Sequence, residues 1–318
     1  MFWLSDISKE NLKSILFSFS NYMDKILIVK LVGGLGNQMF QYAAARAASC
    51  RTKIPFKLDI TFYKKSNLRS YRLNHFNIIE NIATEDDIKR FIIPSKRKTL
   101  QYCNYIIKKK IFCSNSFRRI KQISTKYCQD IFNIKGSSYI TGYWQSEKYF
   151  IDKTEIIRKE LTVKNEPDEK NSKYLKFINE TNSVSLHIRR GDYAYNPEAY
   201  KTYGLLDLDY YTKAIEYISD RVKRINIFAF SDDISWVKKE IKTRFPIYYI
   251  DFNGADKDYE DLRLMYNCKH HIIANSSFSW WGAWLSDNPR KIVIAPMNWY
   301  AKRDINSEDI YGNNWIRL

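Results

Sequence analysis

The sequence predicts an α/β protein of two halves, each with a parallel β-sheet covered by helices. Three observations lead to this fold class. An apolar run at residues 25–32 is followed by a glycine turn and a helical pattern of apolar residues. Between residues 184 and 295, short apolar runs alternate with helical patterns. The charged, proline-containing residues 165–171 separate these two regions. Strands that alternate with helices in this way form βαβ units and doubly wound sheets.

The composition is that of a globular protein with a large core and a strong positive charge. The chain has 318 residues, of which 45% are hydrophobic and 16% aromatic, enough for two domains. Its 52 Lys and Arg against 35 Asp and Glu give a net charge of +17, which suits nucleic acid, an anionic membrane or phosphorylated substrates. Part of the excess lies in dispersed stretches, residues 95–98 and 108–110, which are typical of solvated surfaces.

The cysteines and the N-terminus carry little functional signal. The five cysteines are scattered without C-x-x-C spacing, so the sequence predicts neither a disulfide framework nor a zinc site, and it favours a reducing compartment. Residues 1–24 lack the features of a signal peptide and are too polar to span a bilayer. Their apolar residues recur at helical spacing, which predicts an amphipathic leader helix with no assigned role.

In the first half we expect a strand at residues 25–32, a helix after the glycine turn, a helix that starts near residue 84, and a strand at residues 139–143. Residues 60–135 show no pattern from which a topology follows. In the second half we expect strands at residues 184–188, 225–230, 247–250, 270–274 and 291–295, and helices at residues 210–221, 236–244, 259–266 and 280–285. Because ligands of such sheets bind at the carboxyl ends of the strands, the residues at those ends are the candidate site.

The first strand ends at a glycine turn that contains Gly34 and Gly36. Glycines allow close backbone approach, and the following helix offers free N–H groups to an anion. A phosphate-binding P-loop is excluded because Asn37 and Gln38 stand where Lys and Ser or Thr are needed, and a dinucleotide fingerprint because Met39 occupies a small-residue position. The alternative is a purely structural turn, with Asn37 as an ordinary helix cap.

The end of the strand at residues 184–188 carries the most specific signal. His187 and Arg189 share one face of the strand, and Arg190 and Asp192 follow. Paired arginines at a sheet mouth are costly unless an anion or carboxylate meets them, and a guanidinium matches phosphate oxygens. The alternative is that the arginines pair with Asp192 only to close a loop.

Two further strand ends carry polar residues. Asp232 and Asp233 are either a helix cap or carboxylates that accept hydrogen bonds from a purine or ribose. The segment that begins at Asn275 offers hydroxyl and backbone donors suited to a nucleotide phosphate, and continues with Ser276, Ser277, Phe278 and Ser279. The tryptophans at positions 280, 281 and 284 are expected in the core.

In this order and spacing, VGGLGNQMFQYA, HIRRGDY, FSDD-x-x-W and NSSFSWWGAWL resemble the bacterial α-1,2-fucosyltransferases of glycosyltransferase family 11. GYWQSEKYF at residues 142–150 is also similar to that family. The resemblance covers residues 25–299 and leaves the leader outside.

The resemblance implies a GT-B fold with two facing Rossmann-like domains, residues 25–165 on the acceptor side and residues 172–318 binding the donor. It implies an inverting transfer of fucose from GDP-β-L-fucose to the 2-hydroxyl of a glycan, without metal or other cofactor. Arg189 and Arg190 would neutralise the departing diphosphate. The other implied donor contacts are Gly34, Gly36, Gln38, His187, Asp232, Asp233, Asn275, Ser276, Ser277, Phe278 and Ser279.

Asn37 would lie under the fucose and diphosphate, and is grouped with Arg190 and Asp192 as catalytic. Asp192 is the nearest carboxylate that could act as a base, although we favour a role in orienting Arg190. The implied acceptor is an oligosaccharide or lipid-linked glycan that ends in β-galactose, as in O-antigen synthesis. We expect a cytoplasmic location, in line with the reducing compartment, and peripheral contact with the anionic inner membrane face, which would carry such acceptors and attract the basic surface.

Three alternatives remain open. A metal-dependent glycosyltransferase with another donor would use an Asp-x-Asp pair, and residues 207–209 and 256–258 have that spacing, although they lie in segments that we expect at the surface. A nucleic-acid-binding protein would need a basic module that the sequence does not show. A non-catalytic sugar-binding protein would not need arginines and a glycine turn in one cleft.

Overall fold

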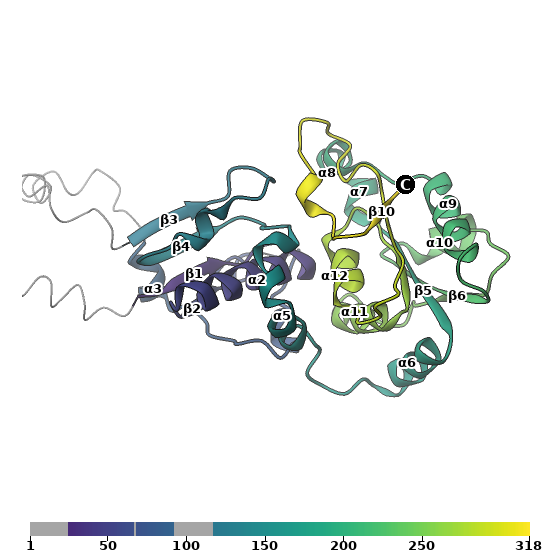
Figure 1. The fold of residues 1–318 in the computed structure, drawn as a ribbon, viewed down its shortest axis with the longest axis horizontal. Helices are drawn as coiled ribbons and strands as arrows, with labels where there is room; N and C mark the ends of the chain where they lie inside the picture. Colours follow the sequence, from purple (N-terminus) through teal and green to yellow (C-terminus); the bar gives the residue numbers. More distant parts are fainter. Residues whose placement is uncertain (1–24, 67, 92–116) are drawn as a thin grey trace, which may run out of the picture.

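The computed structural model describes residues 25–66, 68–91 and 117–318. These form two α/β halves side by side (Figure 1), each built on a parallel sheet. The first sheet has the strand order β2-β1-β4-β3, and the second has the order β10-β9-β8-β5-β6-β7. All pairings between these strands are parallel. The predicted fold class is therefore confirmed.

The first half contains the predicted strand, glycine turn and helix at its start. Its elements are β1 (Leu27–Lys30), α2 (Leu35–Thr52), β2 (Phe56–Asp59), η1 (Leu73–His75), α3 (Glu85–Lys89), β3 (Phe117–Lys121), η2 (Gln129–Phe132), β4 (Ser137–Thr141), η3 (Glu147–Tyr149), η4 (Ile151–Lys153) and α5 (Thr154–Glu160). Helix α3 starts where predicted, because Thr84 and Asp87 form a reciprocal capping box. Strand β3 lies within residues 60–135, where the sequence allowed no topology, and strand β2 was not predicted.

The second half contains all five predicted strands and an additional short one, β10. Its elements are α6 (Glu169–Glu180), β5 (Asn182–Ile188), α7 (Gly191–Tyr195), α8 (Pro197–Tyr203), α9 (Leu208–Ser219), β6 (Ile225–Ser231), α10 (Ile234–Glu240), β7 (Ile247–Tyr249), α11 (Asp258–Asn267), β8 (His270–Ile272), α12 (Ser277–Leu285), β9 (Val293–Ala295), η5 (Glu308–Ile310) and β10 (Ile316–Arg317). Helix α10 ends at Glu240, short of the predicted end at residue 244.

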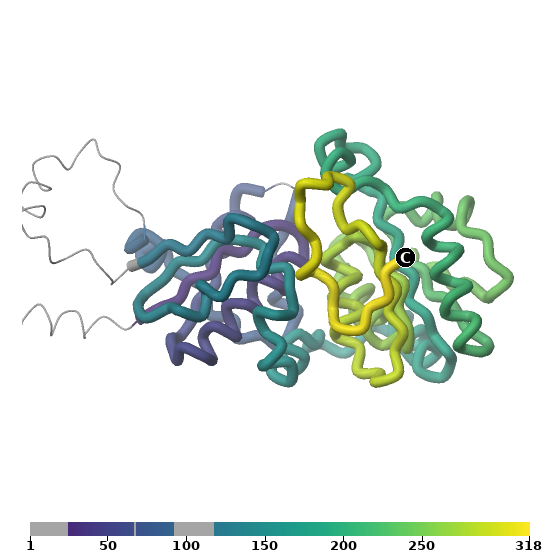
Figure 2. Tube along the Cα trace, turned by 45° about the horizontal axis from the view of Figure 1, so that its top comes forward, coloured from purple at the N-terminus to yellow at the C-terminus, as the bar shows by residue number. Residues whose placement is uncertain are grey.

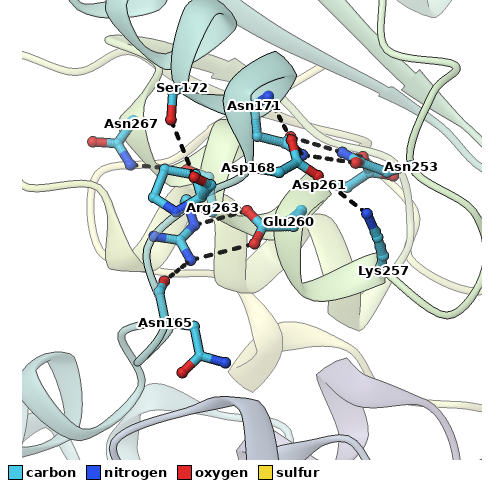
Figure 3. A network of polar contacts seen from close by, with 11 residues as sticks. Asn165, Asp168, Asn171, Ser172, Asn253, Lys257, Glu260, Asp261, Arg263 and Asn267 are labelled. Carbon is cyan, nitrogen blue, oxygen red and sulfur yellow. Dashed lines mark hydrogen bonds and ion pairs between the residues drawn. The ribbon is translucent and has the colours of Figure 1, made fainter.

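The linker between the halves is shorter than predicted, because helix α6 already begins at Glu169. Asp168 caps this helix by accepting a hydrogen bond from the backbone N–H of Asn171 at 2.9 Å. Asn171 in turn exchanges side-chain hydrogen bonds with Asn253, which also donates to Asp261 of α11 at 2.8 Å (Figure 3). The end of the linker is thereby fastened to the second half.

The two halves share one continuous core. Phe40 of α2 packs against Trp280 and Trp281 of α12, with ring centroids 4.5 and 4.9 Å apart. Both tryptophans are fully buried and Trp284 nearly so, which confirms the prediction that they lie in the core. Helices α2 and α12 belong to different halves, so this packing fixes how the halves face each other.

The C-terminal segment crosses back to the first half, and Figure 2 shows it in yellow beside that half. Asp309 accepts a hydrogen bond from the backbone of Tyr127 at 2.7 Å, and the backbone of Asn313 donates to Glu147 at 2.8 Å. Among the described residues, no helix is both long and apolar enough to cross a membrane. The predicted leader helix and the basic stretches at 95–98 and 108–110 lie outside the described residues.

Candidate active site

The structure gathers a cluster of charges at the carboxyl ends of β5 and β6. Arg189 follows β5, and its guanidinium lies 2.9 Å from the Asp232 carboxylate that follows β6. Arg190 lies beside it, with its backbone N–H donating to Asp232 at 2.8 Å and its side chain 3.3 Å from Asp233. The Arg190 guanidinium also stacks over the ring of Trp236, 4.1 Å from its centre. Four of the predicted site residues therefore meet in one place.

Asp233 has the helix-capping role that the sequence allowed, and it has an arginine partner as well. It caps α10 by accepting a hydrogen bond from the backbone N–H of Trp236 at 3.1 Å, and it also pairs with Arg190. Asp232 lies so close to Gly191 that a Cβ there would stand 2.3 Å from its carboxylate oxygen. Gly191 is thus needed for this contact.

Asp192 lies between the two halves and joins them electrostatically. It pairs with Arg189 from its own half and with Arg69 from the other half, whose Nη2 is 3.2 Å from the carboxylate. Arg69 was not among the predicted site residues, because residues 60–135 carry no pattern that places them at a strand end. Only its charge could have indicated it. With Arg69, the cluster holds three guanidinium groups and three carboxylates.

The glycine turn reaches the same boundary, but Gly36 does not have the role expected of it. A Cβ on Gly36 would lie 2.5–2.6 Å from backbone atoms of Ser277 and Phe278, and Trp281 Nε1 donates to the Gly36 carbonyl at 3.0 Å. Glycine is therefore required at position 36 because the backbone of α2 comes close to the start of α12 in the other half. The expected reason was close approach to a ligand. Gly34 has more room, with Arg69 Nη1 4.0 Å from the position of a Cβ.

The side chains of Asn37 and Gln38 point to different surroundings. Asn37 is half-buried, and its Oδ1 accepts a hydrogen bond from Gln145 at 2.8 Å. Gln38 is fully buried; its amide donates to the Ser70 carbonyl at 2.9 Å and accepts from the Arg72 backbone at 2.9 Å. Gln38 thus holds the loop that carries Arg69, and its fully buried side chain does not face open space where the predicted donor contact could form.

His187 is buried at the end of β5, like the apolar residues that alternate with it. The polar face predicted for this strand is therefore not open, because helices cover both faces of the sheet. Burial, and secondarily Arg189, lower the pKa of His187 to about 3, so its ring is neutral. Its Nδ1 has no hydrogen-bond partner in the described part of the chain, and the ring faces Phe278 at 5.7 Å.

The serine-rich segment before α12 is more buried than expected. Asn275 and Ser279 are both 2% exposed; the Asn275 amide donates to the Tyr203 carbonyl at 2.8 Å, and the Ser279 hydroxyl bonds to nearby carbonyls. Ser276 caps α12. The side chains of Asn275 and Ser279 therefore hold protein segments together instead of lining open space, which leaves the half-buried Ser277 and Phe278 as the accessible residues.

Members of the two Asp-x-Asp pairs make contacts with residues outside this cluster. Asp207 caps α9 by accepting from the Tyr210 backbone at 2.9 Å, and Asp209 pairs with Lys213. We expected Asp258 at an open surface, but the structure places it elsewhere. It lies 3.8 Å from Arg72 of the other half, and burial raises its pKa to about 6. Among the described residues, no three His, Cys, Asp or Glu side chains are grouped so that they could hold a metal ion.

Comparison with known proteins gives a consistent result over nearly the whole chain. Residues 20–318 match the sequence profile of "Glycosyl transferase family 11". An "Alpha-1,2-colitosyltransferase" of Escherichia coli is 39% identical over 305 residues, 92% of this chain and 99% of that protein. The "O-antigen biosynthesis glycosyltransferase WbnK" of Escherichia coli is 33% identical over 315 residues, 91% of this chain and 99% of that protein.

Solved structures share the fold at much lower sequence identity. The fucosyltransferase NodZ from Bradyrhizobium aligns with a TM-score of 0.51 and 13% identity, covering 86% of this chain and 95% of that chain. A second structure, NodZ α-1,6-fucosyltransferase co-crystallised with GDP, aligns with a TM-score of 0.50 and 12% identity over the same shares. The two facing α/β halves are therefore those of the GT-B fold.

Proposed function

The chain belongs to glycosyl transferase family 11, and on that premise we propose that it is an inverting α-1,2-fucosyltransferase that uses GDP-β-L-fucose. The oxygen of an acceptor 2-hydroxyl attacks C1 of the sugar as the bond from C1 to the diphosphate breaks. The hydroxyl proton goes to a base, and GDP leaves. Negative charge grows on the departing diphosphate, so positive groups fixed at that place lower the barrier.

The observation that carries this proposal is the convergence of Arg69, Arg189 and Arg190 at the boundary between the halves. In the free protein each of the three is paired with a carboxylate. A diphosphate that enters would exchange with these carboxylates as the partner of the arginines, and a carboxylate released in this way, Asp232 or Asp233, could accept hydrogen bonds from guanine. Asp192 pairs with Arg189 and Arg69, while Arg190 pairs with Asp233, so the orienting role that we expected of Asp192 toward Arg190 is assigned toward the first two arginines instead.

His187, Ser277 and Phe278 complete the proposed donor site. The neutral ring of His187 has a nitrogen without a partner among the described residues, and it can donate or accept one hydrogen bond. The start of α12 offers backbone N–H groups beside it. Asn37 approaches from the first half, at the start of α2.

A second donor is favoured by one comparison. The relative that is 39% identical to this chain is named a colitosyltransferase, so GDP-colitose is the alternative to GDP-fucose. Colitose lacks the 3-hydroxyl of fucose. A site built to hydrogen-bond a hydroxyl discriminates strongly against the sugar that lacks it, so the two donors should be separable by turnover. The relative named for O-antigen biosynthesis supports a glycan of that class as acceptor.

The test is transfer from GDP-fucose and from GDP-colitose, with GDP-mannose and UDP-galactose as controls, to lactose and N-acetyllactosamine, with and without EDTA. We expect an α-1,2-linked product with one of the first two donors, unaffected by EDTA. Transfer that EDTA abolishes and manganese restores would overturn the metal-independent mechanism. If no product forms, calorimetry with GDP distinguishes two causes. Binding of GDP would indicate that the acceptor is wrong, and absence of binding would indicate that the proposed function is wrong.

A further inference from the structure

A cavity of about 410 Å³ lies at the boundary between the halves. The first half contributes the loops after β3 and β4, with Gln122, Tyr143 and Gln145. The second half contributes the end of α8 and the returning C-terminal segment, with Tyr203, Tyr300 and Asn306. Figure 2 shows this yellow segment beside the teal loops of the first half. The volume falls within the range of about 300–1,000 Å³ that is usual for small-molecule sites.

Three tyrosine side chains, from both halves, line the cavity. Tyr203 and Tyr300 face each other with ring centroids 5.7 Å apart, and Tyr203 is stacked on Tyr193 at 4.6 Å with the rings parallel within 2°. Tyr143 projects from the opposite half and is 48% exposed. Burial, followed by nearby tyrosines that include Tyr143, raises the pKa of both Tyr203 and Tyr300, so their hydroxyls stay neutral.

The remaining lining is polar but almost uncharged. Lys121 is the one charged residue among the described residues that line the cavity, and none of them is a carboxylate. Amide and hydroxyl groups are supplied by Asn37, Gln122, Gln145 and Asn306. A ligand with many hydroxyls and an apolar C–H face, but no charge, matches this combination of aromatic faces and neutral hydrogen-bonding groups.

The cavity adjoins the arginine cluster through Tyr193, and it adjoins the start of α2 through Asn37. On one side, the Arg189 guanidinium lies 5.4 Å from the ring of Tyr193, on which Tyr203 stacks. On the other side, Gln145 donates to Asn37 at 2.8 Å and accepts from the Tyr300 hydroxyl at 3.4 Å. A sugar held here would therefore present a hydroxyl toward the place that we assign to the donor.

We propose that this cavity between the two halves binds the neutral terminal sugar of the acceptor glycan, with Tyr143, Tyr203 and Tyr300 against its apolar face. The proposal rests on the proposed function for the identity of the ligand as an acceptor, but not for the presence of a sugar site. It places acceptor recognition on both halves. The sequence-based expectation had placed it in the first half alone.

The test compares Tyr143→Ala with Tyr143→Phe, because Tyr143 is exposed and its loss should not unfold the protein. Loss of one aromatic contact should raise the KM for N-acetyllactosamine about three- to tenfold, while the Kd for GDP stays at its wild-type value. Tyr143→Phe keeps the ring and should stay within about twofold of the wild type. Tyr200→Ala is the matched control, since Tyr200 is an exposed tyrosine of α8 outside the cavity.

Direct binding makes the test independent of turnover. Saturation-transfer NMR with methyl β-D-galactopyranoside, in the presence of GDP, should show contact with the wild type and with Tyr200→Ala, and a weaker signal with Tyr143→Ala. That pattern would support a sugar site even if neither donor were used. An unchanged acceptor KM in Tyr143→Ala would overturn the proposal, as would the absence of any galactoside signal with the wild type.

Discussion

Within the charge cluster, every guanidinium already has a carboxylate partner before any ligand arrives. Arg189 and Arg190 are held by Asp232 and Asp233, and Arg190 is also stacked on Trp236. Such preorganisation fixes the positive charge where it is needed without reorganisation during the reaction. It also means that removing one arginine leaves a carboxylate without its partner, which adds to the electrostatic cost for an anionic ligand.

Arg190→Ala should lower kcat for transfer by about two to three orders of magnitude while the fold remains intact. The reason is the loss of a fixed positive charge beside the proposed leaving group. Transfer kinetics measure kcat, and circular dichroism checks that the fold is intact. Arg244→Ala, at an exposed arginine, is the control. A folded Arg190→Ala protein with wild-type turnover would contradict the assigned role.

Arg69→Ala tests the arginine that comes from the first half. The side chains of Arg69 and Asp192 are 42% and 43% exposed. Loss of this ion pair should therefore change the free energy of unfolding by less than about 1 kcal/mol. Turnover should nevertheless fall by about tenfold or more, because a positive charge at the proposed diphosphate site is lost. Arg69→Lys, which keeps the charge, should recover part of the rate. Equal rates for wild type and Arg69→Ala would limit the site to the second half.

Helices α2 and α12 are one of the element pairs that join the halves, and Gly36 lies at a close contact between them. A methyl group there meets backbone atoms of Ser277 and Phe278, which cannot move aside as a flexible side chain can. Gly36→Ala should therefore lower the free energy of unfolding by about 1–3 kcal/mol, measured by urea denaturation. Gly34→Ala is the matched control, with open space around the added methyl, and should cost under about 1 kcal/mol. Equal costs at both positions would argue against the contact.

Helix α11 carries a carboxyl group whose ionisation opposes folding. Burial raises the pKa of Asp261 to about 7 from an ordinary value of 3.8, with further contributions from Asp258 and Glu260. The folded protein therefore holds a proton that the unfolded chain releases. The stabilisation is fully present below about pH 4 and is lost as the pH rises through 7.

Asp261→Asn should remove this dependence, since the amide oxygen can still accept the hydrogen bond from Asn253. We expect the variant to gain stability relative to the wild type as the pH rises from 5 to 8, by roughly 1–3 kcal/mol. Urea denaturation at both pH values measures the difference. A difference between the two proteins that stays constant across this range would show that Asp261 does not titrate there.

At the scale of the whole molecule, the net charge of +17 predicts attraction to anionic surfaces. Sedimentation with vesicles rich in anionic lipid should retain the protein at low salt and release it as salt screens the charges, while zwitterionic vesicles should not retain it. Failure of anionic vesicles to retain the protein at low salt would remove the membrane-surface hypothesis, without effect on the proposed chemistry.

The sequence by itself determined the two-sheet architecture and the arginine pair. Apolar periodicity is a local property of the chain, so it located β1, β5 and the start of α2 before any contact was known. The rule that ligands bind at the carboxyl ends of parallel strands then selected Arg189 and Arg190. Strands β2 and β3 were not predicted, because their short segments contain charged residues. They become strands only by pairing with β1 and β4.

Only the tertiary structure decided what lies between the halves. Arg69 meets Asp192 across 123 positions of the chain, and Gly36 meets the start of α12, contacts that no local pattern encodes. The tyrosine-lined cavity depends in the same way on the return of the C-terminal segment to the first half. Such contacts depend on how two separately patterned sheets pack, and that packing is set by the shared core around Phe40, Trp280 and Trp281.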